Sequence, residues 1–350
     1  MEKNLSSPLI KALIYVGIIL GAGFASGAEI LAYFADFGDA GFFGLILASA
    51  LFALVGWAIW YICTVKGISD YQSFMDITMG VRFAKIMEAV LGFFMFVVFA
   101  AMLAAMGSAL NESFGFEYLL SISIVAAICF VTFLFGISGI IKLNAYISPL
   151  LIVGCTLIGF LTFAWSDRPA FAIALRSAEL LRSNWYISAV TYVGYNIIGA
   201  VVILPSLICK TKKEALKPAL FSGVILLVLG FSIFISLLAN HLSVAGVQIP
   251  LLALVLRHGP LVTYIFMLLF LAACFTTAAT NGYAVAATIS GRYKVNEILL
   301  KALISLLGVL AALAGFSNFV RVIYPIFAVA GVIEIILIIK YFVTLIVKSP

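Results

Sequence analysis

The chain has 350 residues, of which 65% belong to the apolar set and only 10% are charged, with a mean hydropathy of +1.26 and a formal net charge of +6. A water-soluble domain of this size carries about 25% charged residues, so these side chains cannot cover a surface that faces water. The composition predicts a membrane protein and excludes a separate soluble catalytic domain.

Ten apolar stretches are long enough to cross a hydrocarbon core, which takes about 20 helical residues each. We predict spans at Leu9 to Phe37, Ala40 to Val65, Phe83 to Leu110, Tyr118 to Phe135, Leu143 to Ala164, Tyr186 to Ile208, Ala219 to Asn240, Leu261 to Ile289, Ile298 to Phe316 and Val322 to Val347. The first stretch continues well past the length of a signal peptide, which favours a retained span. No connection is long enough for an independent domain, so we expect residues 1–350 to form one membrane-embedded unit.

The basic residues predict the orientation. With a cytoplasmic N-terminus, fifteen of the 20 Lys and Arg residues lie on the inner side, and the other five lie outside: Arg168, Arg176, Arg182, Arg257 and Arg321. The positive-inside rule then predicts a multi-pass protein of the cytoplasmic membrane with both termini in the cytoplasm. The positive net charge is explained by this topology, so it does not indicate a nucleic-acid partner.

Cysteine and histidine show no pattern of a cofactor site. Five cysteines lie in or beside apolar spans without C-x-x-C spacing, and only two histidines are present, His241 and His258. We therefore expect no metal cluster, haem or redox cofactor. An intramembrane enzyme would need paired carboxylates or a nucleophile with its base, and neither pattern is visible, so we expect that the protein is not an enzyme.

The ten spans divide into two similar halves. A shift of about 175 residues places each of the first five spans on one of the last five, which gives a first repeat at about 9–164 and a second at about 186–347. Because five is odd, the second half begins on the opposite side of the membrane. Inverted repeats of this kind are typical of secondary transporters.

Glycines interrupt the first span of each half. Span 1 holds Gly21, Gly23 and Gly27 at its middle, and an offset of 173 residues places Gly194 of span 6 on Gly21 and Gly199 on Ser26. Each glycine weakens a helix by about 1 kcal/mol relative to alanine. Small residues also allow close helix packing, which is the alternative interpretation. The matched positions favour breaks in spans 1 and 6, whose freed amides and carbonyls would bind a charged solute.

The run Gly21 to Glu29, Gly-Ala-Gly-Phe-Ala-Ser-Gly-Ala-Glu, resembles the YkvI-like membrane proteins, which are amino-acid permeases of the amino acid–polyamine–organocation superfamily. The resemblance implies the LeuT fold, with broken spans 1 and 6 around a central site and spans 3 and 8 beside it. It also implies that the amides of Ala25, Ser26 and Gly27 hold a carboxylate. We assign to the substrate site Gly23, Ala25, Ser26, Gly27, Tyr192, Tyr195, Asn196 and Gly199.

Span 8 supplies a candidate ion site. In sodium-coupled relatives of this fold, a Ser/Thr pair on span 8 joins carbonyls of the span 1 break around Na⁺. That resemblance implies a Na⁺ site at Gly21, Phe24, Thr276 and Thr277. The alternative is that each threonine hydroxyl bonds its own helix, as is usual in membrane helices.

Ionisable groups within the hydrocarbon are costly and usually functional. Glu29 lies two residues beyond Gly27, and we expect it to pair with Arg321 at the outer end of span 10 as a gate, or to carry a proton. A purely structural ion pair is the alternative.

These features together predict a secondary active transporter of a small amino acid or related zwitterion. We expect coupling to Na⁺ rather than H⁺, with the bilayer as its surroundings and no cofactor beyond the coupling ion. An ion channel, suggested by Val193-Gly194-Tyr195, and a membrane scaffold without transport are the competing functions.

Overall fold

The computed structural model describes residues 7–135, 138–166, 184–292 and 296–348, without side-chain positions at 138–148, 291–292 and 348. Within these ranges the chain is helical and contains no strand. Seven helical runs are long and apolar enough to cross a membrane. They are α4 (Ala40–Lys66), α6 (Val81–Phe114), α7 (Tyr118–Phe135), α9 (Trp185–Ile203) with the turn η3 (Leu204–Ser206), α10 (Leu216–Ala239), α13 (Pro260–Arg292), and the run of α15 (Phe316–Asn318), η5 (Phe319–Ile323) and α16 (Tyr324–Lys348).

The other three predicted spans are spans 1, 5 and 9. Span 1 is divided into α1 (Pro8–Ile19), α2 (Ala22–Ala25), α3 (Ala28–Tyr33) and η1 (Ala35–Phe37). Span 5 matches α8 (Ser138–Ala164), which is fully described only over Pro149–Ala164, and span 9 matches the shorter helix α14 (Glu297–Ala312). Short helices make up the connections: α5 (Tyr71–Met79), α11 (His241–Val244), α12 (Pro250–Val255) and η4 (Leu256–His258). Every predicted stretch is thus helical, and among the fully described residues seven runs meet the length and hydropathy of a crossing. Arg168, Arg176 and Arg182, three of the five predicted outer cations, lie outside the described residues.

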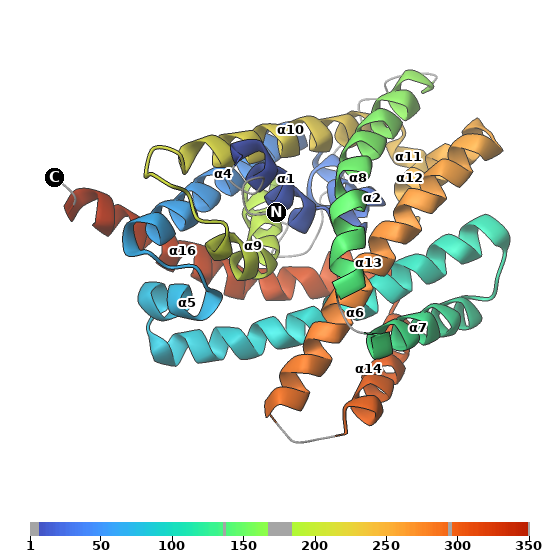
Figure 1. Ribbon diagram of the computed structural model, residues 1–350. Coiled ribbons are helices and arrows are strands. Elements are labelled where there is room, and N and C mark those ends of the chain that lie inside the picture. Colours follow the sequence, from blue (N-terminus) through green and yellow to red (C-terminus); the bar gives the residue numbers. More distant parts are fainter. Residues whose placement is uncertain (1–6, 136–137, 167–183, 293–295, 349–350) are drawn as a thin grey trace.

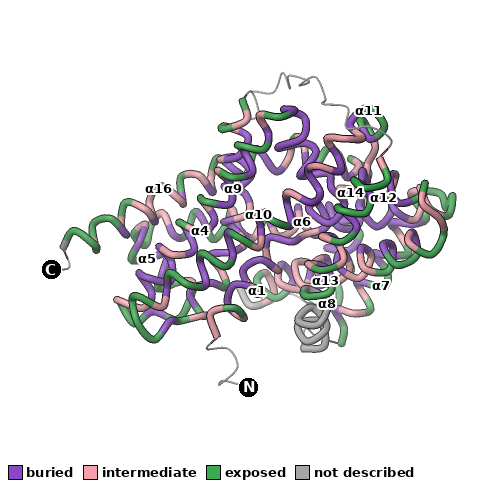
Figure 2. The backbone as a smooth tube through the Cα atoms, turned by 90° about the horizontal axis from the view of Figure 1, so that it is seen from above, coloured by how far each residue is buried: buried purple, intermediate pink, exposed green. Residues whose placement is uncertain are grey.

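Exposed apolar side chains cover the outside of the bundle. Figure 2 shows exposed residues along α7 and along the distal part of α16. Helix α7 exposes Leu120, Ile124, Ile128 and Val131, each about half accessible, at intervals of three or four residues along one face. A water-exposed helix would carry polar residues there, so this face is the one expected to contact lipid. The long apolar helices and their exposed apolar faces identify a membrane protein.

The broken span lies in the interior. Figure 1 shows α1 and α2 in the middle of the molecule, and α1 packs against α10, α8 and α9. Around this centre, α9 packs along α16, α6 along α13, and α10 along both α4 and α8. Residues from α2 and α3 are buried without exception. The interrupted segment is therefore enclosed by protein, which is the condition under which non-helical backbone is tolerated at membrane depth.

The pairing of α9 with α16 depends on two facing glycines. A Cβ atom built on Gly331 would lie 1.9 Å from the carbonyl oxygen of Gly194, and one built on Gly194 would lie 2.7 Å from the carbonyl oxygen of Ala328. The two backbones are thus in direct contact, as small residues permit in membrane helices.

We expect Gly331→Ala to destabilise the protein by about 1–3 kcal/mol, because a helix must move to admit the methyl group. A lower midpoint of thermal unfolding of the detergent-purified protein would show this. Gly199→Ala on α9, whose Cβ would have nothing within 4 Å, is the matched control and should unfold at the wild-type temperature or above it, because alanine favours the helix. Equal midpoints for the two variants would contradict the close contact.

Candidate functional site at the break in span 1

The break predicted in span 1 is present. Helix α1 ends at Ile19, Leu20 and Gly21 are non-helical, and α2 begins at Ala22. Gly27 separates α2 from α3 with a φ of 79°, a left-handed conformation that glycine adopts without strain. The break redirects the hydrogen bonds of the backbone, since the amide of Gly21 donates to Ile19 rather than to the preceding turn. Among the described residues, no backbone amide bonds the carbonyls of Gly17 and Ile18.

The break predicted in span 6 is wrong. Helix α9 runs without interruption from Trp185 to Ile203, through both Gly194 and Gly199. The contact between Gly194 and Gly331 explains the first of these glycines as a packing residue, and a cost of about 1 kcal/mol per glycine is small beside the packing of a whole helix. The helix is followed by the turn η3 at Leu204–Ser206, about ten residues beyond the predicted break at Gly194.

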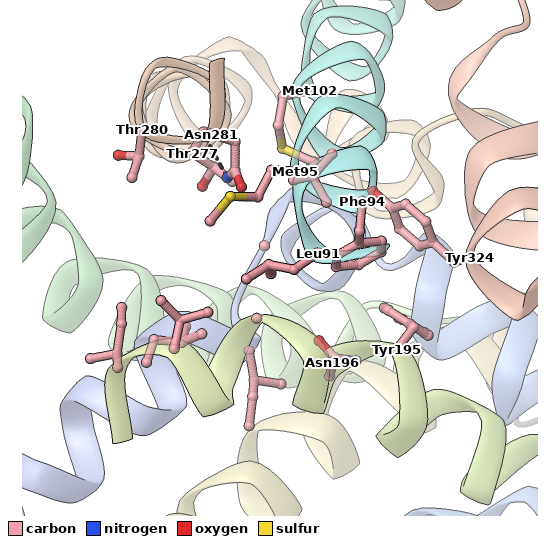
Figure 3. Close-up of a pocket in the computed structure, with 18 of the residues that line it drawn as sticks. Leu91, Phe94, Met95, Met102, Tyr195, Asn196, Thr277, Thr280, Asn281 and Tyr324 are labelled. Atoms are coloured by element: carbon pink, nitrogen blue, oxygen red, sulfur yellow. Dashed lines mark hydrogen bonds between the residues drawn. The ribbon is translucent and has the colours of Figure 1, made fainter. Parts of the chain in front are cut away.

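A cavity of about 190 Å³ opens beside the break in span 1. Seven helices line it, α1, α2, α3, α6, α9, α13 and α16, and Figure 3 shows the contributions of the last four. The lining residues are Gly17, Ile18, Ile19, Gly21, Gly23, Glu29, Leu91, Phe94, Met95, Val98, Met102, Tyr195, Asn196, Gly199, Val202, Ile203, Thr277, Thr280, Asn281 and Tyr324. Glu29 is the one charged residue in this lining, and none of the lining residues is basic. The volume is enough for a small organic solute, since one water molecule needs about 10–15 Å³ on this measure.

The predicted site residues divide into two groups in the structure. Those that line the cavity are Gly21, Gly23, Glu29, Tyr195, Asn196, Gly199 and Thr277. Those that do not are Phe24, Ala25, Ser26, Gly27, Tyr192, Thr276 and Arg321. The first group comes from spans 1, 6 and 8, so the structure brings together parts of the substrate and ion assignments in one place.

The amides expected to bind a carboxylate already have acceptors. Ala25 donates to the carbonyl of Gly21 at 3.1 Å, Ser26 to that of Ala22 at 2.7 Å, and Gly27 to that of Phe24 at 3.0 Å. The hydroxyl of Ser26 donates to the Gly23 carbonyl at 2.8 Å and accepts the amide of Ala28 at 3.1 Å. The expectation that these three amides are free is therefore incorrect, because the short helix α2 uses them to close its own turns.

Glu29 is buried among tyrosines. Its side chain is folded over Gly23, where a Cβ atom would lie 2.0 Å from Oε1, and the residue is 4% exposed. The hydroxyls of Tyr192 and Tyr195 face its carboxyl. Glu29 Oε2 and both of these hydroxyls are buried, and they have no hydrogen-bond partner beyond one another among the described residues. Buried polar atoms are nearly always satisfied, so the carboxyl of Glu29 and the hydroxyl of Tyr195, which line the cavity, could bind a polar ligand there.

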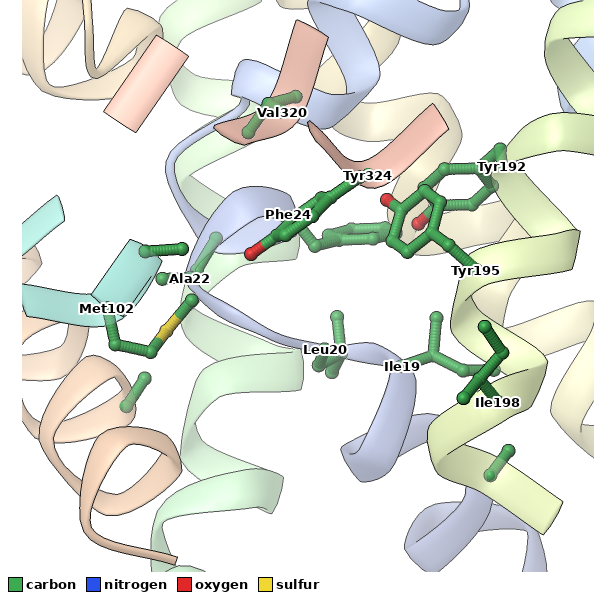
Figure 4. Close-up of a cluster of buried hydrophobic side chains, with 14 of the residues drawn as sticks. Ile19, Leu20, Ala22, Phe24, Met102, Tyr192, Tyr195, Ile198, Val320 and Tyr324 are labelled. Atoms are coloured by element: carbon green, nitrogen blue, oxygen red, sulfur yellow. The ribbon is translucent and has the colours of Figure 1, made fainter. Parts of the chain in front are cut away.

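Two further tyrosines complete this cluster and were not predicted. The ring centroids of Tyr33 and Tyr195 are 5.7 Å apart, and those of Tyr195 and Tyr324 are 5.0 Å apart. Figure 4 shows Tyr192, Tyr195 and Tyr324 beside Phe24, on one side of the end of α1 at Ile19 and the non-helical residue Leu20. The spacing of four residues from Glu29 to Tyr33 is a signal of a shared helix face. Tyr324 carries no such signal, because its position depends on how span 10 packs.

One wall of the cavity is apolar. Leu91, Phe94, Met95, Val98 and Met102 recur at helical spacing on α6 and all line the cavity. Of the aromatic residues that the sequence offers in this span, Phe94 lies in the wall, whereas Phe93 is 61% exposed and Phe99 packs against Phe133. The wall suits an apolar side chain of a ligand.

The expected pairing of Glu29 with Arg321 is incorrect. Arg321 Nη1 donates to Asp36 Oδ2 at 3.0 Å, and Nε2 of His241 lies 3.0 Å from Asp36 Oδ1. Asp36 is buried at the predicted outer end of span 1 and joins η1, α11 and η5. Sequence reasoning missed Asp36 because it lies seven residues, about two turns, beyond Glu29. Arg321 lies in the π-helical segment η5, a distortion that is frequent at functional sites.

The candidate ion ligands have local partners. Thr276 donates to the carbonyl of Ala273 at 3.1 Å, and the carbonyls of Gly21 and Phe24 accept the amides of Ala25 and Gly27. Thr277 lines the cavity together with Gly21.

The chain is similar to another membrane protein over most of its length, although no family model matches it. A protein of Bacillus subtilis (strain 168) described as uncharacterized membrane protein YkvI is 28% identical over 288 residues, which are 81% of this chain and 81% of the relative. The resemblance to the YkvI-like membrane proteins is thereby confirmed.

Three solved structures are similar to the fold. The inward-facing conformation of Mhp1 has a TM-score of 0.65 at 16% identity, and the match covers 97% of this chain and 77% of the Mhp1 chain. MhsT in complex with L-phenylalanine has a TM-score of 0.63 at 16% identity, covering 94% and 88%. A Na⁺-coupled sialic acid symporter in its substrate-bound outward-open state has a TM-score of 0.56 at 14% identity, covering 92% and 75%. These likenesses confirm the LeuT fold.

Proposed function

We propose that this protein is a secondary active transporter of a small amino acid or related zwitterion, which works by alternating access around the break in span 1. The observation that carries the proposal is the cavity at that break, where the carboxyl of Glu29 and the hydroxyl of Tyr195 are buried with no partner among the described residues beyond one another and Tyr192. Support comes from the neighbours of the fold, which include a Na⁺-coupled symporter and a protein in complex with L-phenylalanine. Transport rather than enzymatic chemistry is part of the proposal.

The proposed substrate pose follows the chemistry of the lining. The ammonium group lies at Glu29, where the carboxyl and tyrosine hydroxyls provide acceptors. An apolar side chain lies against Leu91, Met95 and the other residues of the α6 wall. Gly21, Gly23 and Gly199 border the same space and leave room for the solute because they have no side chains.

The proposal includes the side to which the cavity opens. Its lining extends to Gly17 on α1 and Ile203 on α9, which the charge distribution assigns to the cytoplasmic half. At the opposite end, Asp36 joins Arg321 and closes the route. This arrangement agrees with the likeness to an inward-facing structure. Ten spans in a 5+5 inverted repeat, a single transporter domain and cytoplasmic termini belong to the same proposal.

Na⁺ is the proposed coupling ion, with oxygen ligands from Gly21, Phe24, Thr276 and Thr277. Oxygen-only coordination suits a hard cation. We expect Thr276→Ala combined with Thr277→Ala to remove the dependence of uptake on Na⁺, because two of the four ligand oxygens are lost. Uptake assayed in proteoliposomes with Na⁺ or choline outside measures this. Thr288→Ala on the exposed face of the same helix is the control. An unchanged Na⁺ dependence of the double variant would remove this site from the proposal.

Flux through reconstituted protein tests the function as a whole. Saturable uptake of labelled L-leucine or L-phenylalanine into liposomes, driven by an imposed Na⁺ or H⁺ gradient, is the expected result. Conductance at channel rates would instead show an ion channel. The absence of both, across the 20 common amino acids, would show a scaffold without transport.

A further inference from the structure

Glu29 is a buried carboxyl group without a basic partner among the described residues. It is 4% exposed, and Oε2 has no hydrogen-bond partner there beyond the neighbouring tyrosines. Arg321 and His241 both contact Asp36, and Lys11 donates to the carbonyl of Ile208.

Several elements bring groups to Glu29. Tyr192 and Tyr195 come from α9, and Tyr324, with Cys274 of α13 beside it, comes from α16, while Tyr33 of α3 lies beside Tyr192 and Tyr195. From α10 and α12, Leu237 and Leu251 approach the chain at Gly27 with apolar side chains. The segments η1 and η5 also pack against α3, and their charged residues Asp36 and Arg321 bond each other. Aromatic faces and phenol oxygens attract an ammonium ion, so the surroundings favour a positively charged organic guest.

An unpaired carboxylate in a buried site costs several kcal/mol, and the cost is removed either by a proton or by a bound cation. We propose that the Glu29 carboxyl binds a proton and the ammonium group of the substrate in alternation, so that each substrate molecule that binds releases one proton. This inference rests on the proposed function and adds to it a rule of exchange at the same site.

The exchange balances in atoms and charge. The neutral carboxylic acid of Glu29 loses its proton to water, and the arriving ammonium group forms an ion pair with the resulting carboxylate. For an amine the charge of the site is the same before and after, because one positive charge replaces another. A zwitterion also brings the negative charge of its own carboxylate. A proton gradient would then drive substrate in the opposite direction, in addition to any force from Na⁺ at the threonine site.

Three matched probes test the rule on the full-length protein in detergent. They are L-phenylalanine, phenethylamine, which lacks the carboxylate, and 3-phenylpropionate, which lacks the amine; the leucine series of L-leucine, isoamylamine and 4-methylpentanoate serves in parallel. Both amines stay protonated between pH 6 and pH 8. Isothermal titration in buffers of different ionisation enthalpy gives the affinity and the number of protons released.

We expect the amines and amino acids to bind with release of up to one proton at pH 6, and the desamino acids not to bind. The dissociation constants of the amines and amino acids should rise as the pH falls, by up to about tenfold per pH unit, because one proton competes with one ligand. Glu29→Gln should weaken amine binding at pH 8 by about tenfold or more and abolish both proton release and pH dependence. Glu334→Gln, at a second buried carboxyl without a hydrogen-bond partner that does not line the cavity, is the matched control and should keep both.

The outcomes separate this rule from the proposed function. Binding that does not change with pH in the wild type, or proton release that persists in Glu29→Gln, overturns the exchange and leaves a transporter. Absence of binding by every amine and amino acid at all pH values overturns both. If Glu29→Gln does not fold, Glu29→Asp decides, since it keeps the acid: weaker binding with retained proton release supports the rule, and loss of proton release with retained binding overturns it.

Discussion

Replacing Gly23 by alanine is expected to weaken substrate binding and uptake strongly while the protein stays folded. The new Cβ atom would lie 2.0 Å from Oε1, 2.5 Å from Cδ and 2.7 Å from Cγ of Glu29, so the carboxyl must leave its position. The displaced group is the end of a flexible side chain, which limits the cost to the fold. Because the carboxyl is moved away from the hydroxyls of Tyr192 and Tyr195, we expect the affinity for amines to fall by about tenfold or more.

Titration calorimetry with phenethylamine and uptake in proteoliposomes measure this effect. Gly92→Ala on α6 is the control, since its Cβ would have nothing within 4 Å and it does not line the cavity. Its binding and uptake should equal those of the wild type. If Gly23→Ala bound and transported like Gly92→Ala, the position of the Glu29 carboxyl would have no part in substrate recognition.

The second large effect is expected at the outer end of the route. Arg321→Ala removes the hydrogen-bonded guanidinium from Asp36, which is buried, while the arginine side chain itself is 32% exposed. A hydrogen bond between charged groups is worth about 2 kcal/mol, or roughly thirtyfold in the ratio of closed to open molecules. We therefore expect this variant to populate an outward-open conformation and to lose net uptake.

A buried reporter measures that opening. Ser188 at the outer end of α9 is fully buried and donates to the carbonyl of Tyr33 at 2.8 Å. In a Ser188→Cys background, a membrane-impermeant thiol reagent should react faster when Arg321→Ala is present. Arg257→Ala, at an exposed arginine on the same predicted side, should leave the rate unchanged. Equal rates in all three proteins would show that the contact between Asp36 and Arg321 does not hold the outer side closed.

Much of the fold could be read from the sequence because hydropathy and glycine act locally. A stretch such as Ala40 to Val65 has few alternatives to a long apolar helix, and the predicted span agrees with α4 to within one residue. Three glycines within seven residues weaken one helix enough to open it between Ile19 and Ala22. In span 6 the same reasoning failed, because the role of Gly194 depends on Gly331, which lies 137 residues away in sequence and in contact in space.

A residue of the candidate site could be predicted only where its own residue type and its place within one span both indicated a role. Glu29 is identified by its charge within an apolar span, and it does line the cavity. The amides of Ala25, Ser26 and Gly27 were misassigned because their hydrogen bonds depend on the short helix α2, which forms in the tertiary fold. The partner of Arg321 was also misassigned, since two acidic residues lie near the outer half of span 1 and only the packing of η1 against η5 selects Asp36.

The unbroken course of α9 has a mechanical consequence. With 19 residues it is about 28 Å long, so it behaves as a stiff lever beside a jointed first span. A tilt of about 10° would carry one tip of such a lever about 5 Å sideways relative to the other, about the pitch of one helical turn. A tilt of α9 about its contact with α16 at Gly194 would therefore displace Ile203 at the cavity. The non-helical backbone at Leu20 and Gly21 could accommodate that displacement on the opposite wall.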